Sequence, residues 1–243
     1  MSGPGDEVGP VRFQPGDDGV AVVSLHRPDK LNIYDLGMRD ALIEAFTAVA
    51  DDAAVRAVLL RADGRHFSAG ADLSEFGSAG SVMAARRIRW ERDPWVPLWT
   101  LPQPTVVALH GYALGAGLEM ALLCDVRLAA RDTRLGLPET GLGMLPSAGG
   151  TQSLPRVVGP GAALPVILTA ATLDAEDAAR RGIVHRVVDD VESEAREVAA
   201  RLAALPPAAA QAARRALRAA ADLPLPEGLG VERRLARRAT RDL

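Results

Sequence analysis

The stretch His110-Gly111-Tyr112-Ala113-Leu114-Gly115-Ala116-Gly117-Leu118-Glu119 decides how this 243-residue chain is interpreted. An apolar run at 106–109 leads into it, and apolar residues at helical spacing follow it. We therefore expect a strand, a turn of small residues and a helix over 115–124. Such a turn leaves backbone N–H groups bare at a helix N-terminus, where negative charge is favoured. With the Glu119 carboxylate in the first turn of the helix, the stretch supplies half of an active site.

The composition excludes several classes of protein. Hydrophobic residues make up 48% of the chain, which is enough for a large core, and the formal net charge of −3 argues against general affinity for nucleic acid or membrane surfaces. No run reaches the ~20 apolar residues that a membrane helix needs, and residues 1–10 lack the apolar core of a signal peptide. Cys124 is the only cysteine and has leucine neighbours, so we expect a buried thiol. These features predict a soluble cytoplasmic protein.

Strand and helix signals alternate along the chain. Their recurrence with glycine-rich loops between them predicts an α/β fold with parallel strands. We expect residues 1–10 to be flexible, 11–190 to form a core domain and 191–243 to be a helical C-terminal section. The expected strands are 11–14, 20–25, 55–60, 105–109, 125–129, 134–137 and 183–188, and the expected helices are 36–50, 81–92, 115–124, 191–204, 207–222 and 227–240.

Two loops of small residues, 68–72 and 114–117, each follow an expected strand. If the sheet brings them together, one N–H group from each could bind the same oxygen. An oxyanion hole is built in this way, and one donor is typically worth ~2.7–4 kcal/mol to a transition state. For either loop alone, the interpretation that its glycines only serve a tight turn stays open.

Glu119 and Glu139 are the candidate catalytic carboxylates. A lone glutamate on a helix is usually a solvated surface residue. The helix around Glu119, however, is apolar on nearly every face, which predicts that it is buried. A buried carboxylate needs a partner or a raised pKa, and both are common at functional sites. Glu139 follows Leu137-Pro138 in a loop that leads into further glycines.

Several segments, in their order and spacing, resemble the crotonase, or enoyl-CoA hydratase/isomerase, superfamily. The resemblance covers roughly residues 11–240. It implies a crotonase-like spiral of repeated ββα units with a helical C-terminal section that forms trimers. The matching segments are RPDKLN at 27–32, FSAGADL at 67–73, GYALGAGLE at 111–119, CD at 124–125, PE at 138–139, PSAGGTQ at 146–152 and GIVHRVV at 182–188.

The resemblance also implies roles for residues of this chain. The N–H groups of Ala71 and Ala116 would form the oxyanion hole that stabilises a thioester enolate. Glu119 and Glu139 would hold one water and move its protons during hydration of a trans-2-enoyl-CoA to a 3-hydroxyacyl-CoA, a step of fatty-acid β-oxidation. Relatives usually carry glycine at the position of Ala116. A backbone N–H survives this change if the local backbone suits alanine.

The same resemblance implies an acyl-CoA substrate, no metal and no further cofactor, and a homotrimer or a dimer of trimers. Many relatives continue past the position of Leu243 with another helix that covers the acyl and CoA groove. For Arg27 and Lys30, solvated loop charges remain the alternative to phosphate contacts. The candidate substrate-binding residues are Arg27, Lys30, Ala69, Gly70, Asp72, Leu73, Tyr112, Leu114, Gly115, Pro138 and Leu142.

Other interpretations of the same residues are weaker or stay open. A dinucleotide fingerprint at Gly115 would need a third glycine where Met120 stands. Ser147 lacks the first glycine of a nucleophile elbow, because Leu145 occupies that position. The four histidines show no metal-ligand spacing. An enoyl-CoA isomerase and a catalytically silent acyl-CoA-binding protein remain as alternative functions.

Overall fold

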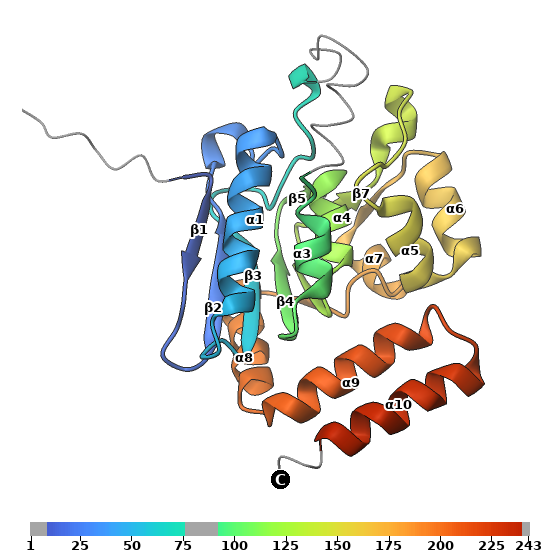
Figure 1. Ribbon diagram of the computed structural model, residues 1–243. Helices are drawn as coiled ribbons and strands as arrows, with labels where there is room; N and C mark the ends of the chain where they lie inside the picture. The colour runs from blue at the N-terminus through green and yellow to red at the C-terminus, as the bar shows by residue number, and fades with distance from the viewer. Residues whose placement is uncertain (1–8, 76–91, 240–243) are drawn as a thin grey trace, which may run out of the picture.

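Two β-sheets form the framework of the computed structural model, which describes residues 9–75 and 92–239 (Figure 1). In the larger sheet the first two strands form an antiparallel hairpin, and every other neighbouring pair is parallel. The parallel pairing expected from the sequence is therefore confirmed for this sheet. Its strands, in spatial order, are β1 (Val11–Gln14), β2 (Val20–Leu25), β3 (Ala57–Ala62), β4 (Thr105–Leu109), β6 (Val126–Ala130) and β9 (Arg186–Val188).

The smaller sheet contains β5 (Tyr112–Leu114), β7 (Arg134–Gly136) and β8 (Thr172–Asp174). β5 pairs in parallel with β7, and β7 pairs antiparallel with β8. The sequence predicted only a turn between the strand at 105–109 and the following helix. That prediction was wrong, because the chain forms β5 there and only then turns into the helix.

Helices cover both faces of the larger sheet. The Asp35 side chain caps the helix α1 by accepting a hydrogen bond from the Met38 amide. Buried residues then recur every three or four positions along α1 and form its apolar face. The helices are α1 (Leu36–Asp51), α3 (Trp95–Thr100), α4 (Ala116–Leu122), α5 (Gly150–Val158), α6 (Pro160–Leu168), α7 (Ala175–Arg180), α8 (Val191–Ala203), α9 (Pro207–Ala220) and α10 (Leu225–Ala239), and the short 3-10 turns are η1 (Pro28–Lys30), η2 (Leu73–Glu75) and η3 (Pro138–Leu142).

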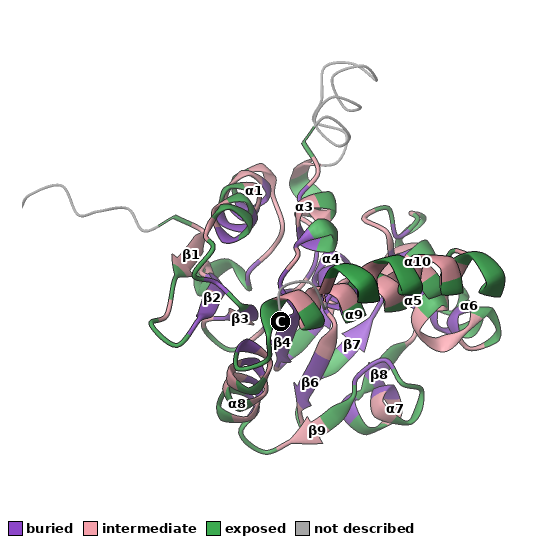
Figure 2. Ribbon diagram, turned by 60° about the horizontal axis from the view of Figure 1, so that its bottom comes forward, coloured by how far each residue is buried: buried purple, intermediate pink, exposed green. Residues whose placement is uncertain are grey.

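The central strands of the larger sheet, β2, β3, β4 and β6, are largely buried on both faces, as Figure 2 shows for β2, β4 and β6. Alternate residues of each strand point to opposite faces. On one face Leu59 and Val106 pack against the alanine stripe of α8, which includes Ala195. On the other face Leu60 and Val107 belong to the core that α1 and α4 share. Cys124 lies in the same core, which confirms the predicted buried thiol.

The C-terminal helices α9 and α10 form an antiparallel pair below the sheets in Figure 1. An ion-pair cluster holds α9 on the body of the protein. The Asp125 carboxylate accepts hydrogen bonds from Arg214 Nε at 2.6 Å, from Arg218 Nη2 at 3.1 Å and from the Thr105 amide at 2.8 Å. α10 has no buried residue and is largely exposed in Figure 2.

Most predicted elements lie within two residues of the observed ones, and the differences have local causes. The strand expected at 55–60 is shifted to 57–62, because the Val55 amide donates to Asp52 in the turn after α1 and pairing with β2 begins at Ala57. The strand expected at 183–188 begins only at Arg186. Ile183 and Val184 instead donate to Ala178 at the end of α7. The helix expected at 81–92 falls almost entirely outside the described residues.

None of the helices in the described ranges combines the length and the apolar character that crossing a membrane requires.

Replacing Asp125 with alanine should lower the free energy of unfolding by about 3 kcal/mol, because largely buried guanidinium groups lose their counter-charge. The matched control is Asp189→Ala, since the Asp189 side chain is 83% exposed in its pair with Arg131. Loss of a surface pair should cost less than about 1 kcal/mol. Urea unfolding measures both variants. Equal losses would show that the Asp125 ion pairs do not hold α9.

Candidate active site

The structure brings the two small-residue loops side by side. On one side of the 68–72 segment, the Ser68 amide donates to the Tyr112 carbonyl at 2.8 Å and the Leu114 amide donates to Ser68 at 3.1 Å. On the other side, Tyr34 donates to Gly70 at 2.8 Å and accepts from Asp72 at 2.9 Å. The segment therefore lies between the loop before α1 and the strand β5, and it ends beside the N-terminus of α4.

Two amide groups at this junction have no protein acceptor among the described residues. Tyr34 and Ala71 form an isolated parallel β-bridge in which Tyr34 bonds to the Gly70 carbonyl and the Asp72 amide. The N–H group of Ala71, between them, therefore points away from Tyr34. Ala116 is the first residue of α4, where an N–H group has no acceptor within the helix. Because this first position has helical backbone angles, alanine fits there without strain, and its N–H group is kept.

Two glycines allow the loops to approach so closely. Gly70 has φ +102° and Gly115 has φ +50°, which are conformations that other residues rarely adopt. A Cβ on Gly70 would lie 3.2 Å from the Leu114 carbonyl oxygen, and one on Gly115 would lie 2.8 Å from Glu139 Oε1. The glycines at these positions thus allow the two loops to contact each other and leave room for the Glu139 carboxyl group.

Glu119 projects from α4 into the core and is only 2% exposed. Its Oε1 atom accepts hydrogen bonds from the Gly150 amide at 2.7 Å and the Ala148 amide at 3.0 Å. Burial and the nearby charge of Glu139 raise the pKa of Glu119 to about 7, although the two amide hydrogen bonds oppose this change. The burial predicted from the apolar helix is confirmed, and the carboxyl group changes its protonation near neutral pH.

The glycine-rich passage before α5 therefore positions Glu119, a role that the sequence analysis missed. It matched 146–152 only to a family motif. The available signal was Gly149-Gly150 at the start of a helix that has no capping side chain. Bare amides at such a position need an acceptor. A Cβ on Gly150 would lie 2.9 Å from Glu119 Oε1, so the passage must be free of side chains there.

Glu139 lies in η3, beside Gly115 and therefore next to the bare Ala116 amide. Its Oε2 atom is buried and has no hydrogen-bond partner within the described part of the chain. Burial raises the pKa of this carboxyl group as well. A buried polar atom without a partner is costly in a folded protein unless a ligand or a water serves it. The Glu139 carboxyl group is thus available to a bound molecule.

Asn32 is a second positioning residue that the sequence analysis did not identify. Its side-chain amide is 1% exposed and donates to the Asp63 carbonyl at 2.9 Å and the His66 carbonyl at 2.8 Å. Its own carbonyl accepts from the Ser68 hydroxyl at 2.8 Å. Asn32 has φ +50°, a conformation that asparagine tolerates better than most residues. It fixes the loop that carries Ala71.

The candidate phosphate-binding residues differ in what they contact. Arg27 forms an ion pair with Asp35, the N-cap residue of α1, so its guanidinium group is already engaged. Lys30 is exposed and has no carboxylate partner among the described residues. Asp72 accepts hydrogen bonds from the Ser74 hydroxyl and amide, which lower its pKa together with the positive charges of Lys30 and Arg27. Of the two cations, Lys30 is the one available to a ligand.

The remaining candidates surround these loops. Leu73 and Leu142 are more than half exposed, so both side chains are accessible to a ligand. The Tyr112 ring stacks on His66 with centroids 4.2 Å apart. The other candidates are backbone positions near the junction. The Ala69 amide donates to the Leu31 carbonyl, and Gly70 lies against Leu114. Gly115 precedes α4, and Pro138 begins η3.

Chemically, this junction combines two bare amide donors with two carboxyl groups of raised pKa. Such a set can bind a developing oxyanion and transfer protons beside it. Among the residues that the structure describes, no three His, Cys, Asp or Glu side chains are arranged to hold a metal ion.

The ionisation of Glu119 should appear in the stability of the protein. Because its pKa is higher in the folded than in the unfolded chain, stability is lost as pH rises from about 4.5 through about 7, by about 3 kcal/mol in total. Glu119→Gln removes this ionisation. Its unfolding free energy should therefore fall less between about pH 5 and about pH 8 than that of the unmodified chain. Denaturant titrations at both pH values test this, and identical pH dependence in the two proteins would contradict the raised pKa.

Comparison with known proteins agrees with this geometry. A family model described as enoyl-CoA hydratase/isomerase matches residues 16–242. The 2,3-dehydroadipyl-CoA hydratase of Escherichia coli is 38% identical, over 89% of this chain and 85% of its own length. The enoyl-CoA hydratase of Bacillus anthracis is 33% identical, with a TM-score of 0.88 over 94% of this chain and 90% of that structure.

A relative from Thermobifida fusca, solved in complex with CoA, is 30% identical, with a TM-score of 0.88 over 96% of this chain and 94% of that structure. The structural likeness confirms the crotonase fold expected from the sequence motifs. Because the family model matches nearly the whole chain and the relatives are 30–38% identical, the chain belongs to the enoyl-CoA hydratase/isomerase family of the crotonase superfamily.

Proposed function

We propose that this protein is an enzyme that hydrates a trans-2-enoyl-CoA to a 3-hydroxyacyl-CoA, as in fatty-acid β-oxidation. The observation that carries the proposal is the pairing of the buried Glu119 carboxyl group with the partly buried Glu139 carboxyl group beside two unengaged amides. The hydratase named among its relatives acts on an enoyl-CoA, and another relative was solved with CoA. No metal and no cofactor other than the CoA carried by the substrate is required.

The two amides would polarise the substrate carbonyl. In this proposal the thioester oxygen accepts hydrogen bonds from the Ala71 and Ala116 N–H groups. As water adds to the β-carbon, the π electrons of the double bond move toward this oxygen and an enolate forms. The N-terminus of α4 carries partial positive charge, so its field adds to the stabilisation of the enolate.

The two carboxyl groups would divide the proton transfers. Glu119 Oε1 is occupied by two amide donors, which leaves Oε2 to take the proton from the attacking water. The water oxygen bonds to the β-carbon, and the proton of the Glu139 carboxyl group passes to the α-carbon as the enolate collapses. In the reacting form the single proton of the pair is on Glu139. After the reaction it is on Glu119, and it must return to Glu139 before the next turnover, so the net reaction consumes only water. Two coupled carboxyl groups of raised pKa are suited to this.

The exposed residues around the loops would hold the rest of the substrate. Leu73, Leu142 and Tyr112 offer apolar surface to the acyl and pantetheine portions. Lys30 is the available cation for a CoA phosphate, while Arg27 supports this loop through Asp35. The backbone at Ala69, Gly70, Asp72, Leu114, Gly115 and Pro138 completes the groove.

We further propose that the protein works in the cytoplasm as a homotrimer or a dimer of trimers. The helices α9 and α10 expose the side chains of Leu217, Leu225 and Leu229, which a subunit contact would cover. Sedimentation equilibrium of the purified protein measures this directly. A monomer at micromolar concentration would contradict the assembly without touching the proposed chemistry.

The test of the reaction is turnover of purified protein with short and medium trans-2-enoyl-CoA thioesters, followed by loss of the conjugated enoyl absorbance. Glu119→Gln keeps an oxygen for the two amide donors but cannot take a proton. Turnover should therefore fall by a factor of about 10² to 10⁴. Glu139→Gln should lose a comparable factor. The matched control is Glu197→Gln on the exposed surface of α8, which should retain full activity.

Each other outcome selects a different function. If Glu139→Gln converts 3-enoyl-CoA to 2-enoyl-CoA as fast as the unmodified protein, the enzyme is an isomerase that uses Glu119 alone. If the unmodified protein binds the thioesters but never converts them, it is a silent acyl-CoA-binding protein. Either result would overturn the hydratase proposal.

A further inference from the structure

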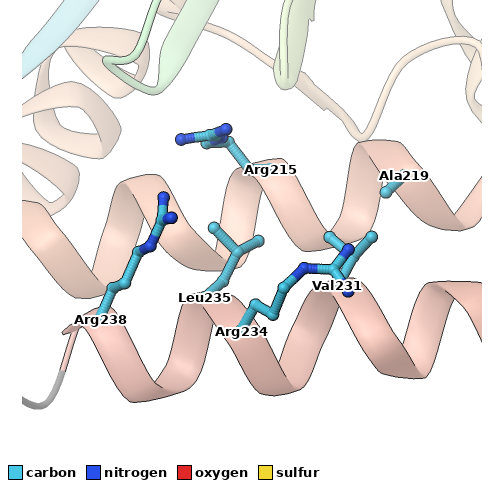
Figure 3. A pocket seen from close by; sticks show the side chains of 6 residues that line it. All are labelled: Arg215, Ala219, Val231, Arg234, Leu235 and Arg238. Carbon is cyan, nitrogen blue, oxygen red and sulfur yellow. The ribbon is translucent and has the colours of Figure 1, made fainter.

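A cavity of about 320 Å³ lies between the helices α9 and α10 (Figure 3). Its volume is within the lower range of small-molecule sites, which is ~300–1,000 Å³. The catalytic loops lie near the top of Figure 1, whereas α9 and α10 lie at the bottom. The cavity is therefore separate from the site of Glu119. Its lining consists of Arg215 and Ala219 from α9 and Val231, Arg234, Leu235 and Arg238 from α10.

The charge of the cavity comes from three arginines. Arg215, Arg234 and Arg238 have no carboxylate within ion-pair distance among the residues that the structure describes. Their neighbours on α9 behave differently, since Arg214 and Arg218 both pair with Asp125. Arg234 and Arg238 are also four residues apart on one helix, where like charges repel. An anion between these side chains would remove the repulsion.

The rest of the lining is apolar. Ala219, Val231 and Leu235 are half-buried and form the wall between the two helices. Figure 3 shows the Leu235 side chain between those of Arg238 and Arg234, with Arg215 near Arg238 and the Arg234 side chain extending toward Val231. The cavity thus offers cationic groups around an apolar surface. A hydrated inorganic anion would contact only the cationic groups, whereas an anion attached to an apolar body would contact both the cationic groups and the apolar surface.

Guanidinium groups favour one class of anion in particular. The planar fork of arginine donates two parallel hydrogen bonds to a phosphate or carboxylate group, and a phosphate carries enough oxygens to engage several arginines at once. We propose that the α9–α10 cavity is a binding site for an organic phosphate. The phosphoryl group lies between Arg215 and Arg238, and the apolar body of the ligand packs on Leu235 and Val231 toward Arg234.

Isothermal titration of the full-length protein with phenyl phosphate and with inorganic phosphate tests the site. Phenyl phosphate should bind more tightly than inorganic phosphate. The double variant Arg234→Gln/Arg238→Gln should weaken phenyl phosphate binding at least tenfold. The matched control, Arg180→Gln/Arg201→Gln, removes the same charge from exposed positions outside the cavity and should leave binding unchanged. Leu235→Ala should reduce the preference for phenyl phosphate over inorganic phosphate while keeping the affinity for inorganic phosphate.

Three results would overturn the proposal. The first is no saturable binding of either probe at millimolar concentration. The second is equal weakening in the cavity variant and in the control, which would show a general effect of net charge. The third combines two observations: the cavity variant has a lower assembly mass, and the unmodified protein shows no saturable phosphate binding. This result would assign the arginines to subunit contact. Circular dichroism of each variant verifies that the helices are retained.

Discussion

The structure of the site depends on one buried interaction, the acceptance of two backbone N–H groups by Glu119 Oε1. This contact joins the helix α4 to the start of α5, and it holds a carboxyl group among mostly apolar core residues. The backbone amides are rigid donors, so the carboxyl group has one orientation. Its second oxygen is left for a bound molecule, and Glu139 raises its pKa further by repulsion.

The surrounding elements serve to keep this arrangement in place. The parallel order of β3, β4 and β6 delivers two loops to the same edge, and the smaller sheet joins them through β5. At the other end of α4, Arg218 donates to the Leu123 carbonyl at 3.3 Å while it binds Asp125. Cations at a helix C-terminus stabilise it. The C-terminal helices are therefore tied to the helix that carries Glu119.

Much of this could be predicted from the sequence, because the information was local. The apolar runs identified the main strands, and the helix around Glu119 was identified as buried. The oxyanion-hole positions of Ala71 and Ala116 came from the family resemblance, and their roles stay a prediction, as does the division of the chain at residue 190. The strand β5 and the holding of Glu119 by Ala148 and Gly150 could not be predicted. Both depend on contacts between segments about 20 to 45 residues apart.

Glu119 is expected to titrate near neutral pH because burial disfavours its charged form and the nearby charge of Glu139 adds to this effect. The most direct measurement is carbon NMR of protein labelled at the glutamate carboxyl carbons, with the Glu119 resonance assigned by its loss in Glu119→Gln. We expect a midpoint near pH 7 that moves to lower pH in Glu139→Gln, since the repelling charge is gone. A midpoint near the ordinary value of 4.5, unchanged in Glu139→Gln, would contradict the claim.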